Sequence, residues 1–183
     1  MKIIAIVCLS IMAYLSPNVT SPNIYQFTMT SIEGKPVSLK KYEGKVMIIV
    51  NTASKCGFTP QYADLEKFYK EYNSKGVALL GFPANNFMHQ EPGTSEDIKS
   101  FCEKNYGVTF DMFEKIEVKG KDINPLYDFL THKAKNGNVE GDVSWNFQKF
   151  VINKKGEVVA TFSPKTSVYD AEVVALVQKL IKE

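Results

Sequence analysis

Hydrophobic residues along this chain fall into two patterns: short unbroken apolar runs, and longer segments with an apolar position every three or four residues. Two runs, at residues 45–51 and 77–82, have the length of buried strands. Residues 60–74, between them, show helical spacing and predict one amphipathic helix. Its apolar positions are Tyr62, Leu65, Phe68 and Tyr69. Two parallel strands joined by a helical crossover form a right-handed βαβ unit.

Cap and turn residues predict the elements around this unit. Thr59 is placed to cap the helix, with Pro60 at its first position and Gly76 beyond its end. Two hairpins and three more helices follow from the remaining patterns. The strands are expected at 25–29 with 37–39 and at 146–152 with 157–163, and the helices at 95–105, 124–134 and 169–182. This order predicts an α/β, thioredoxin-like fold with an N-terminal β-hairpin extension.

The composition, 44% hydrophobic and 23% charged over 183 residues, is typical of one globular domain, which we place at residues 22–183. A net charge of +2 with scattered lysines gives no reason to expect nucleic-acid binding. At the N-terminus, Lys2 precedes an uncharged, largely apolar run at residues 3–15 and then a polar stretch. We interpret residues 1–21 as a signal peptide for export to the periplasm or beyond the cell. An uncleaved anchor or a misread start is the alternative, and the latter implies a cytoplasmic protein.

Three cysteines are present, and removal of the signal would take Cys8 and leave Cys56 and Cys102. In an oxidising compartment these two could form a structural disulfide. The sequence has no CxxC motif, and its two histidines, His89 and His132, are far apart. A zinc site is therefore not expected.

Cys56 stands at the end of the first predicted strand, just before the helix. Functional groups of open α/β sheets gather outside the carboxyl ends of parallel strands. The free N–H groups of a helix N-terminus favour a thiolate over a thiol, and Lys55 adds a neighbouring positive charge. Position alone leaves two interpretations open, a reactive sulfur and an inert buried cysteine.

The loop at residues 83–94, "PANNFMHQEPGT", follows the second predicted strand and carries more polar and aromatic groups than a connection needs. Gln90 is among them. Trp145 and Asn146 open a later predicted strand and can reach the same edge of the sheet. A core tryptophan with a capping asparagine is the alternative interpretation.

Three segments together resemble the glutathione peroxidase family: "NTASKCGFT" around Cys56, "GFPANNFMHQEPG" around Gln90 and "WNFQKF" from Trp145. The resemblance extends over residues 24–180. It implies a thioredoxin fold and an antioxidant peroxidase that reduces hydrogen peroxide and organic hydroperoxides without a metal or an organic cofactor. It also implies that Cys56 is the nucleophile and that Gln90, Trp145 and Asn146 are its hydrogen-bonding partners.

Departures from the family pattern bear on the expected reaction rate and on the assembly state. A cysteine stands where some members have selenocysteine, which suggests slower chemistry, and Ala84 and Asn86 replace common loop residues. Residues 132–144 lack the insertion that carries assembly contacts in tetrameric members, so a monomer is implied.

Thioredoxin-dependent members resemble this chain in having a second cysteine on the helix after "QEPG", which implies that Cys102 resolves the sulfenic acid. Here it directly follows Phe101, whereas many relatives have one residue between, and one residue is about 100° of helix rotation. A buried packing cysteine is therefore the alternative. The reductant is expected to be a thioredoxin-like protein, with glutathione as the second possibility. A redox relay or sensor that oxidises a partner protein is a further alternative.

Overall fold

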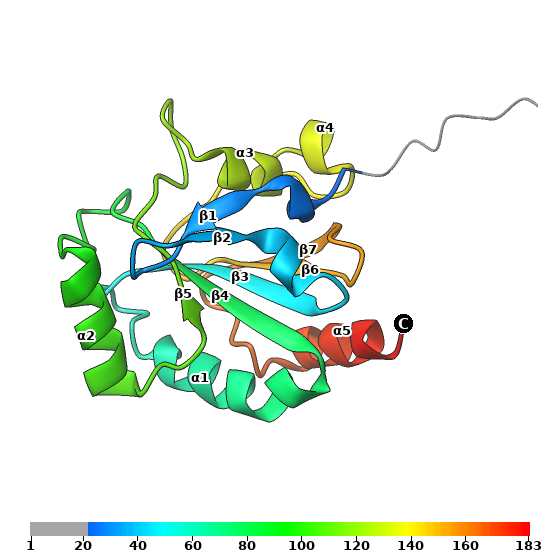
Figure 1. Ribbon diagram of the computed structural model, residues 1–183, viewed down its shortest axis with the longest axis horizontal. Coiled ribbons are helices and arrows are strands. Elements are labelled where there is room, and N and C mark those ends of the chain that lie inside the picture. The colour runs from blue at the N-terminus through cyan, green and yellow to red at the C-terminus, as the bar shows by residue number, and fades with distance from the viewer. Residues whose placement is uncertain (1–21) are drawn as a thin grey trace, which may run out of the picture.

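The computed structural model describes residues 22–183, which are built around a five-stranded mixed sheet (Figure 1). The strand order is β5-β4-β3-β6-β7. The strands are β3 (Val46–Thr52), β4 (Val77–Pro83), β5 (Asp111–Met112), β6 (Lys149–Ile152) and β7 (Val158–Phe162). Strands β3, β4 and β5 run parallel, whereas β6 and β7 are antiparallel to their neighbours. A separate hairpin, β1 (Thr28–Thr30) with β2 (Pro36–Ser38), precedes the sheet.

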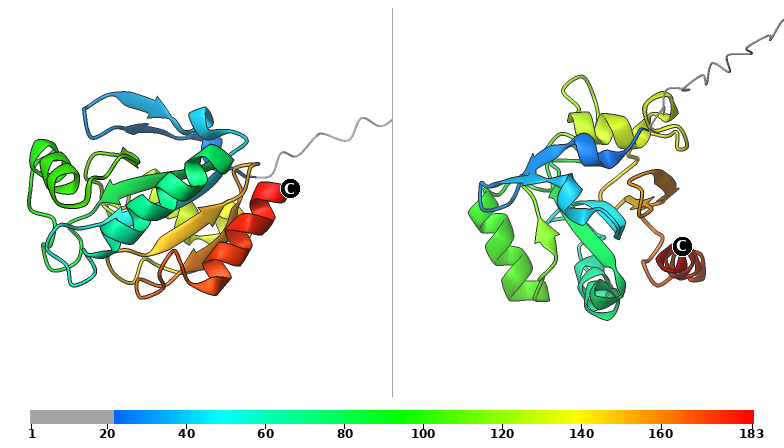
Figure 2. Two further views of the ribbon diagram at one scale, coloured as in Figure 1. Left: turned by 90° about the horizontal axis from the view of Figure 1, so that it is seen from below. Right: turned by 45° about the vertical axis from the view of Figure 1, so that its right-hand side comes forward.

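Helices cover both faces of the sheet. They are α1 (Gln61–Tyr72), α2 (Ser95–Tyr106), α3 (Pro125–Thr131), α4 (Lys133–Asn136) and α5 (Ala171–Lys182), with 3-10 turns η1 (Ile24–Gln26), η2 (Leu39–Tyr42) and η3 (Asn73–Lys75). In Figures 1 and 2, α1 and α5 lie on one face, and α3, α4 and the β1–β2 hairpin lie on the other, while α2 stands beside the β5 edge.

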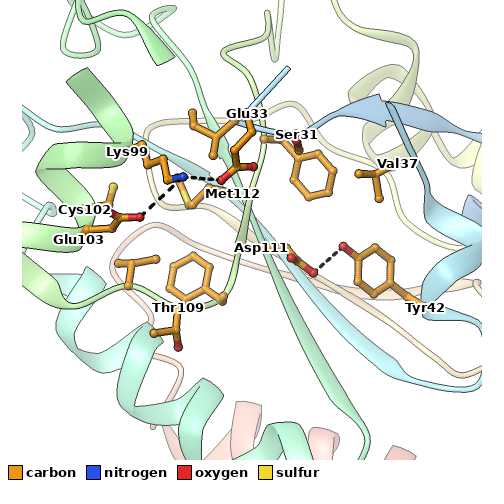
Figure 3. A pocket seen from close by; sticks show the side chains of 14 residues that line it. Ser31, Glu33, Val37, Tyr42, Lys99, Cys102, Glu103, Thr109, Asp111 and Met112 are labelled. Atoms are coloured by element: carbon orange, nitrogen blue, oxygen red, sulfur yellow. Dashed lines mark hydrogen bonds and ion pairs between the residues drawn. The ribbon is translucent and has the colours of Figure 1, made fainter. Parts of the chain in front are cut away.

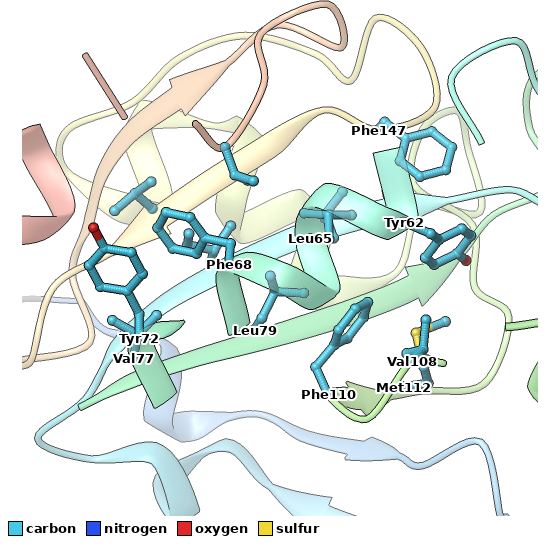
Figure 4. Packing of buried hydrophobic residues seen from close by; sticks show 14 of the residues in the cluster. Tyr62, Leu65, Phe68, Tyr72, Val77, Leu79, Val108, Phe110, Met112 and Phe147 are labelled. Carbon is cyan, nitrogen blue, oxygen red and sulfur yellow. The ribbon is translucent and has the colours of Figure 1, made fainter. Parts of the chain in front are cut away.

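The unbroken apolar run of β3 splits between these two layers because successive side chains of a strand point to opposite faces. Val46, Ile48 and Val50 pack into the core under α1 and α5, which Figure 4 shows around Leu65. Met47 and Ile49 pack into the second core, under α3 and the hairpin. The sheet is therefore buried on both sides, and its edge at the carboxyl ends of β3 and β4 is left for loops.

The βαβ unit is confirmed, since β3 and β4 pair in parallel from Val46 and Val77 onward with α1 between them. The first predicted strand begins later than expected. The side chain of Asn23 accepts a hydrogen bond from the backbone N–H of Tyr25 and starts the η1 turn there. The two-residue strand β5 was not predicted because its pairing with β4 depends on tertiary contact and not on an extended apolar pattern.

The predicted helix at 124–134 is in fact two helices that meet at His132, whose backbone is extended. The Asn136 side chain donates to the carbonyls of Phe129 and Leu130, at 2.9 and 3.2 Å, and so takes the acceptors that a continuing helix would use. No helix among the described residues is long and apolar enough to cross a membrane. The predicted signal peptide, residues 1–21, lies outside the described part of the chain.

Candidate active site

Cys56 lies in a tight turn at the carboxyl end of β3. Its backbone N–H donates to Thr59 Oγ1 at 3.0 Å, and that hydroxyl donates to the carbonyl of Ala53 at 2.8 Å. The prediction that Thr59 caps α1 is therefore wrong. Pro60 occupies the N-cap position without a side-chain cap, because the Thr59 hydroxyl is used to close the cysteine turn.

Cys56 is nearly covered, with 9% of the residue exposed. The backbone N–H of Phe58 points at Sγ, with a nitrogen–sulfur distance of 3.4 Å. This contact comes from the turn just before α1, where the sequence predicted backbone N–H groups close to the thiol.

A backbone hydrogen bond joins the cysteine turn to the loop that follows β4. The N–H of Lys55 donates to the carbonyl of Gln90 at 3.0 Å. On the other side, the amide of Asn146 donates to Gln90 Oε1 at 3.0 Å, and Asn146 is fully buried. Because β6 is antiparallel to β3, the residues before β6 reach the same sheet edge as those after β3 and β4. Three distant segments therefore meet around Gln90.

The two loops that hold this pair are conformationally strained. Among residues 22–183, the non-glycine residues with positive φ are Met88 (52°), His89 (51°) and Phe147 (68°). All three stand next to or near Gln90 and Asn146 in sequence. Residues other than glycine rarely adopt a positive φ, and such strained backbone is found most often at functional sites.

Trp145 is half-buried and packs its ring on Phe87, with 5.2 Å between ring centroids. Its carbonyl accepts a hydrogen bond from the side chain of Asn51, at the end of β3. The expectation that Trp145 and Asn146 open a strand is wrong. They lie in a turn before β6, because the left-handed backbone of Phe147 cannot continue a ladder.

The structure therefore gathers Cys56, Gln90, Trp145 and Asn146 at one edge of the sheet, as predicted. Within residues 22–183, no hydrogen bond links the three partner side chains to the sulfur, which is contacted by the Phe58 N–H. The role of these side chains as donors stays a prediction. Among the same residues, no group of three or more histidine, cysteine, aspartate or glutamate side chains is placed to hold a metal ion.

An apolar cleft of about 410 Å³ opens beside the cysteine turn. Phe58, Trp145 and Pro164 form its walls, and Lys165 stands among its lining residues. Phe58 connects the cleft to the cysteine turn, because it lines the cleft and its backbone N–H contacts the sulfur, although Cys56 itself is not a lining residue. The cleft can accept an apolar group.

Cys102 lies in the middle of α2 with 1% of the residue exposed, and it faces the core, which was the alternative orientation. Burial raises the pKa of its thiol to about 11, and the charges of Glu91 and Glu103 act in the same direction. A cavity of about 330 Å³ adjoins it, between α2, β5 and the hairpin (Figure 3). Cys56 and Cys102 are both free thiols.

Glu91, which the sequence analysis did not single out, is 1% exposed. Burial raises the pKa of its carboxyl to about 7, against the opposing effects of Ser54, Lys115 and Lys55. Its place beside Gln90 in "QEPG" was the available signal. A glutamate in a polar loop is usually solvated, so its burial could not be read from the pattern.

Comparison with known proteins decides the family. The family model "Glutathione peroxidase" matches residues 24–131. The chain belongs to the glutathione peroxidase family. This membership confirms the resemblance and makes the protein a peroxidase-type oxidoreductase.

Relatives in this family cover most of the chain. The "Glutathione peroxidase" of Lactococcus lactis subsp. cremoris is 50% identical, over 82% of this chain and 95% of that protein. The "Hydroperoxy fatty acid reductase gpx1" of Synechocystis sp. is 45% identical, over 86% and 95%. The "Glutathione peroxidase-like peroxiredoxin HYR1" of Saccharomyces cerevisiae is 43% identical, over 87% and 96%.

Solved structures confirm the fold. The family structure "Trgpx in apo form" has a TM-score of 0.68 and 33% identity, and the match covers 88% of this chain and 97% of that one. A thioredoxin-family thiol:disulfide interchange protein from Chlorobium tepidum has a TM-score of 0.62 at 20% identity, which shows the fold alone. The predicted thioredoxin-like α/β fold is therefore correct for this glutathione peroxidase family member.

Proposed function

We propose that this chain reduces hydrogen peroxide and organic hydroperoxides through a sulfenic acid at Cys56. The observation that carries the proposal is the hydrogen bond between half-buried Gln90 and buried Asn146, held at the sheet edge where Cys56 also lies. The thiolate attacks the terminal peroxide oxygen, the O–O bond breaks, and the departing oxygen takes up a proton to leave as water or an alcohol. Cys56 is left as the sulfenic acid.

Neutral donors suit this step. Developing charge on the departing oxygen is stabilised by preorganised N–H groups, and an amide or an indole supplies them without acting as a competing base. Gln90 accepts from Asn146 through Oε1, so its own NH₂ group remains to donate. The indole N–H of Trp145 is the second donor, on a ring that packing against Phe87 holds in place.

The cleft of Phe58, Trp145 and Pro164 supports organic hydroperoxides as substrates in addition to hydrogen peroxide. An apolar chain bound there would place its peroxide group beside the sulfur, while Lys165 could meet a carboxylate at the rim. The Synechocystis relative carries the name hydroperoxy fatty acid reductase, which agrees with such a substrate.

For the return to the thiol, we propose that Cys102 attacks the sulfenic acid and that a thioredoxin-like protein reduces the resulting disulfide. The yeast relative's name, glutathione peroxidase-like peroxiredoxin, supports this route over direct reduction by glutathione. We further propose a monomer that is exported, so that its reductant acts outside the cytoplasm. The short segment 132–144 and the apolar run at 3–15 are the supporting features.

Mass spectrometry of the purified protein tests the cycle directly. One equivalent of hydroperoxide should lower the mass by two hydrogens and link the peptides that contain Cys56 and Cys102. Peroxide consumption should then continue when a thioredoxin system is supplied, and more slowly with glutathione. A folded protein that consumes no hydroperoxide with either donor would overturn the proposal, and the starting mass reports whether the signal has been removed.

A further inference from the structure

A cluster of buried polar atoms lies between the two cysteines and has no partners. Seven buried side-chain oxygen atoms in residues 22–183 lack a hydrogen bond, and five of them belong to four residues. These residues, which we call the carboxyl–hydroxyl cluster, are Thr52, Ser54, Tyr62 and Glu91. Buried polar groups almost always have partners, so five unpartnered atoms on these four residues require an explanation.

The cluster consists of two pairs, Tyr62 with Thr52 and Glu91 with Ser54, and Cys102 adjoins the first pair. The Tyr62 hydroxyl lies against the Cys102 thiol and the Thr52 hydroxyl, and the Glu91 carboxyl lies against Ser54, without reaching hydrogen-bond geometry. The charge of Glu91 acts on both Tyr62 and Cys102. In Figure 4 the Tyr62 ring sits at the end of the core that is nearest to Val108.

The same cluster reaches the cysteine turn. Thr52 ends β3, and Ser54 precedes Cys56 by two residues. A cavity of about 260 Å³ is lined by Ser54 and Glu91 on one side and by Ile98 and Phe101 of α2 on the other. Glu91 therefore stands between the turn that carries Cys56 and the helix that carries Cys102.

Formation of a Cys56–Cys102 disulfide requires a group near both sulfurs that can accept a proton and then donate it. Cys102 must lose its proton to attack the Cys56 sulfenic acid, and the hydroxide that leaves must gain one to become water. Burial opposes ionisation of Cys102, so its proton needs a local acceptor. The reaction as a whole neither takes up nor releases a proton, which means that one carboxyl group can serve both ends.

We propose that Glu91 accepts the Cys102 proton through the Tyr62 hydroxyl and returns it to the hydroxide that leaves the Cys56 sulfenic acid. The S–O bond of the sulfenic acid breaks, the S–S bond forms, and the proton moves from one sulfur to the released water. Glu91 acts through Tyr62 and is a proton-holding residue, not a group in contact with the reacting sulfur. This inference rests on the proposed resolving role of Cys102.

The charged groups around Glu91 are consistent with this role. Lys55 and Lys115 favour its ionised form, while burial favours the neutral form. Asp97 lines the same cavity, and Glu103 acts on Cys102 from α2. With the pKa of Glu91 at about 7, its carboxyl can both accept and donate a proton near neutral pH, where general acid–base groups work best.

Rapid kinetics on Glu91→Gln test the proposal. A chemical trap for sulfenic acid and quenched mass spectrometry for the disulfide separate the two steps after one equivalent of hydrogen peroxide. The disulfide step should slow by about 10²- to 10⁴-fold, which is the usual contribution of a general acid–base group. In the wild type its rate should change with pH around 7, and in the variant that dependence should be lost. Glu91→Asp, which keeps the carboxyl group, should restore part of the rate.

Two further variants separate this role from a structural one. Tyr62→Phe keeps the ring and removes the hydroxyl, so it should slow the same step even if Glu91→Gln fails to fold. Glu96→Gln, an exposed glutamate at the start of α2, is the matched control and should leave the rate unchanged. A wild-type disulfide rate in both Glu91→Gln and Tyr62→Phe would overturn the role of Glu91 alone. Absence of any Cys56–Cys102 disulfide in the wild type would overturn the two-cysteine cycle and this role together.

Discussion

The two cysteines occupy opposite environments within one fold. Cys56 lies in a loop at a strand end, with a backbone N–H aimed at its sulfur and the Gln90–Asn146 pair at the same edge. Cys102 lies in mid-helix, 1% exposed, with a thiol pKa of about 11. The first thiol therefore lies in a loop beside polar side chains, whereas the second is enclosed in the core.

Because of this difference, we expect backbone movement in the step that would form the Cys56–Cys102 disulfide. A disulfide needs Cα atoms within about 7 Å and specific side-chain directions, which a loop cysteine and a core-facing helix cysteine rarely satisfy without backbone movement. We expect α2 to open locally, since it stands at the sheet edge with the cavity of Figure 3 beside it. Oxidation should need only chemistry at a preformed site, whereas resolution should need helix opening as an equilibrium that precedes the proton transfer and the sulfur chemistry.

The largest effects should come from removing each sulfur. Cys56→Ser should abolish peroxide turnover without loss of fold, because the change is nearly isosteric and lies in a loop. Cys102→Ser should still oxidise once, then stop at the sulfenic acid or rise to the sulfinic acid under excess peroxide. Steady-state turnover with thioredoxin, together with product mass, checks both variants. If Cys102→Ser turned over like the wild type, the protein would be a one-cysteine peroxidase and Cys102 would have no role in turnover.

Loss of a donor at the Cys56 site should have the next largest effect. Gln90→Ala, or Trp145→Phe with its ring retained, should slow single-turnover oxidation by 10²- to 10³-fold, because one preorganised donor contributes on the order of 3 kcal/mol. Stopped-flow fluorescence or quenched mass spectrometry reports the rate. Gln26→Ala, an exposed amide on η1, is the matched control. Unchanged oxidation in both site variants would show that the donors are misassigned.

The first environment was largely predictable from sequence, and the second was not. Cys56, Gln90 and Trp145 each lie in a connection that leaves or enters the same edge of the sheet, so the sheet topology brings these connections together. Whether Cys102 faces the core depends on how α2 is rotated against Tyr62, and the burial of Glu91 depends on α2 lying beside its loop. Contacts between distant segments decide these points, and no local pattern encodes them. Thr59 failed as a predicted cap for a local reason, because its hydroxyl is bonded to Cys56 and Ala53 in the turn before α1.

A stability measurement should reveal the cost of burying Glu91. Its pKa rises from 4.5 to about 7 on folding, so the native state binds the proton more tightly than the unfolded state. The free energy of unfolding should therefore fall as the pH rises from about 4.5 to about 7, by an amount on the order of 3 kcal/mol at about 1.4 kcal/mol per pKa unit. Glu91→Gln should lack this decrease.

Urea denaturation of wild type and Glu91→Gln at pH 5 and pH 8 checks this expectation. The variant should gain stability relative to the wild type on going to pH 8, whereas Glu96→Gln should follow the wild type. An equal pH dependence in wild type and Glu91→Gln would mean that the carboxyl is as well solvated in the native state as in the unfolded chain.

The smallest effect should come from the helix that carries Cys102, and it has an unusual sign. Thr94 and Asp97 form a capping box at the start of α2, with the Thr94 hydroxyl accepting from the Asp97 N–H at 3.2 Å. Thr94→Ala should destabilise α2 by about 1 kcal/mol. If resolution requires α2 to open, the open state becomes about fivefold more populated, and disulfide formation should accelerate by about that factor. Amide hydrogen exchange on α2 should rise in parallel.

Asn124→Ala, which removes the equivalent cap of α3, costs similar stability at a distance and should leave the disulfide rate unchanged. A slower or unchanged rate in Thr94→Ala, with faster exchange confirmed, would show that Cys102 reaches Cys56 without unwinding of the helix.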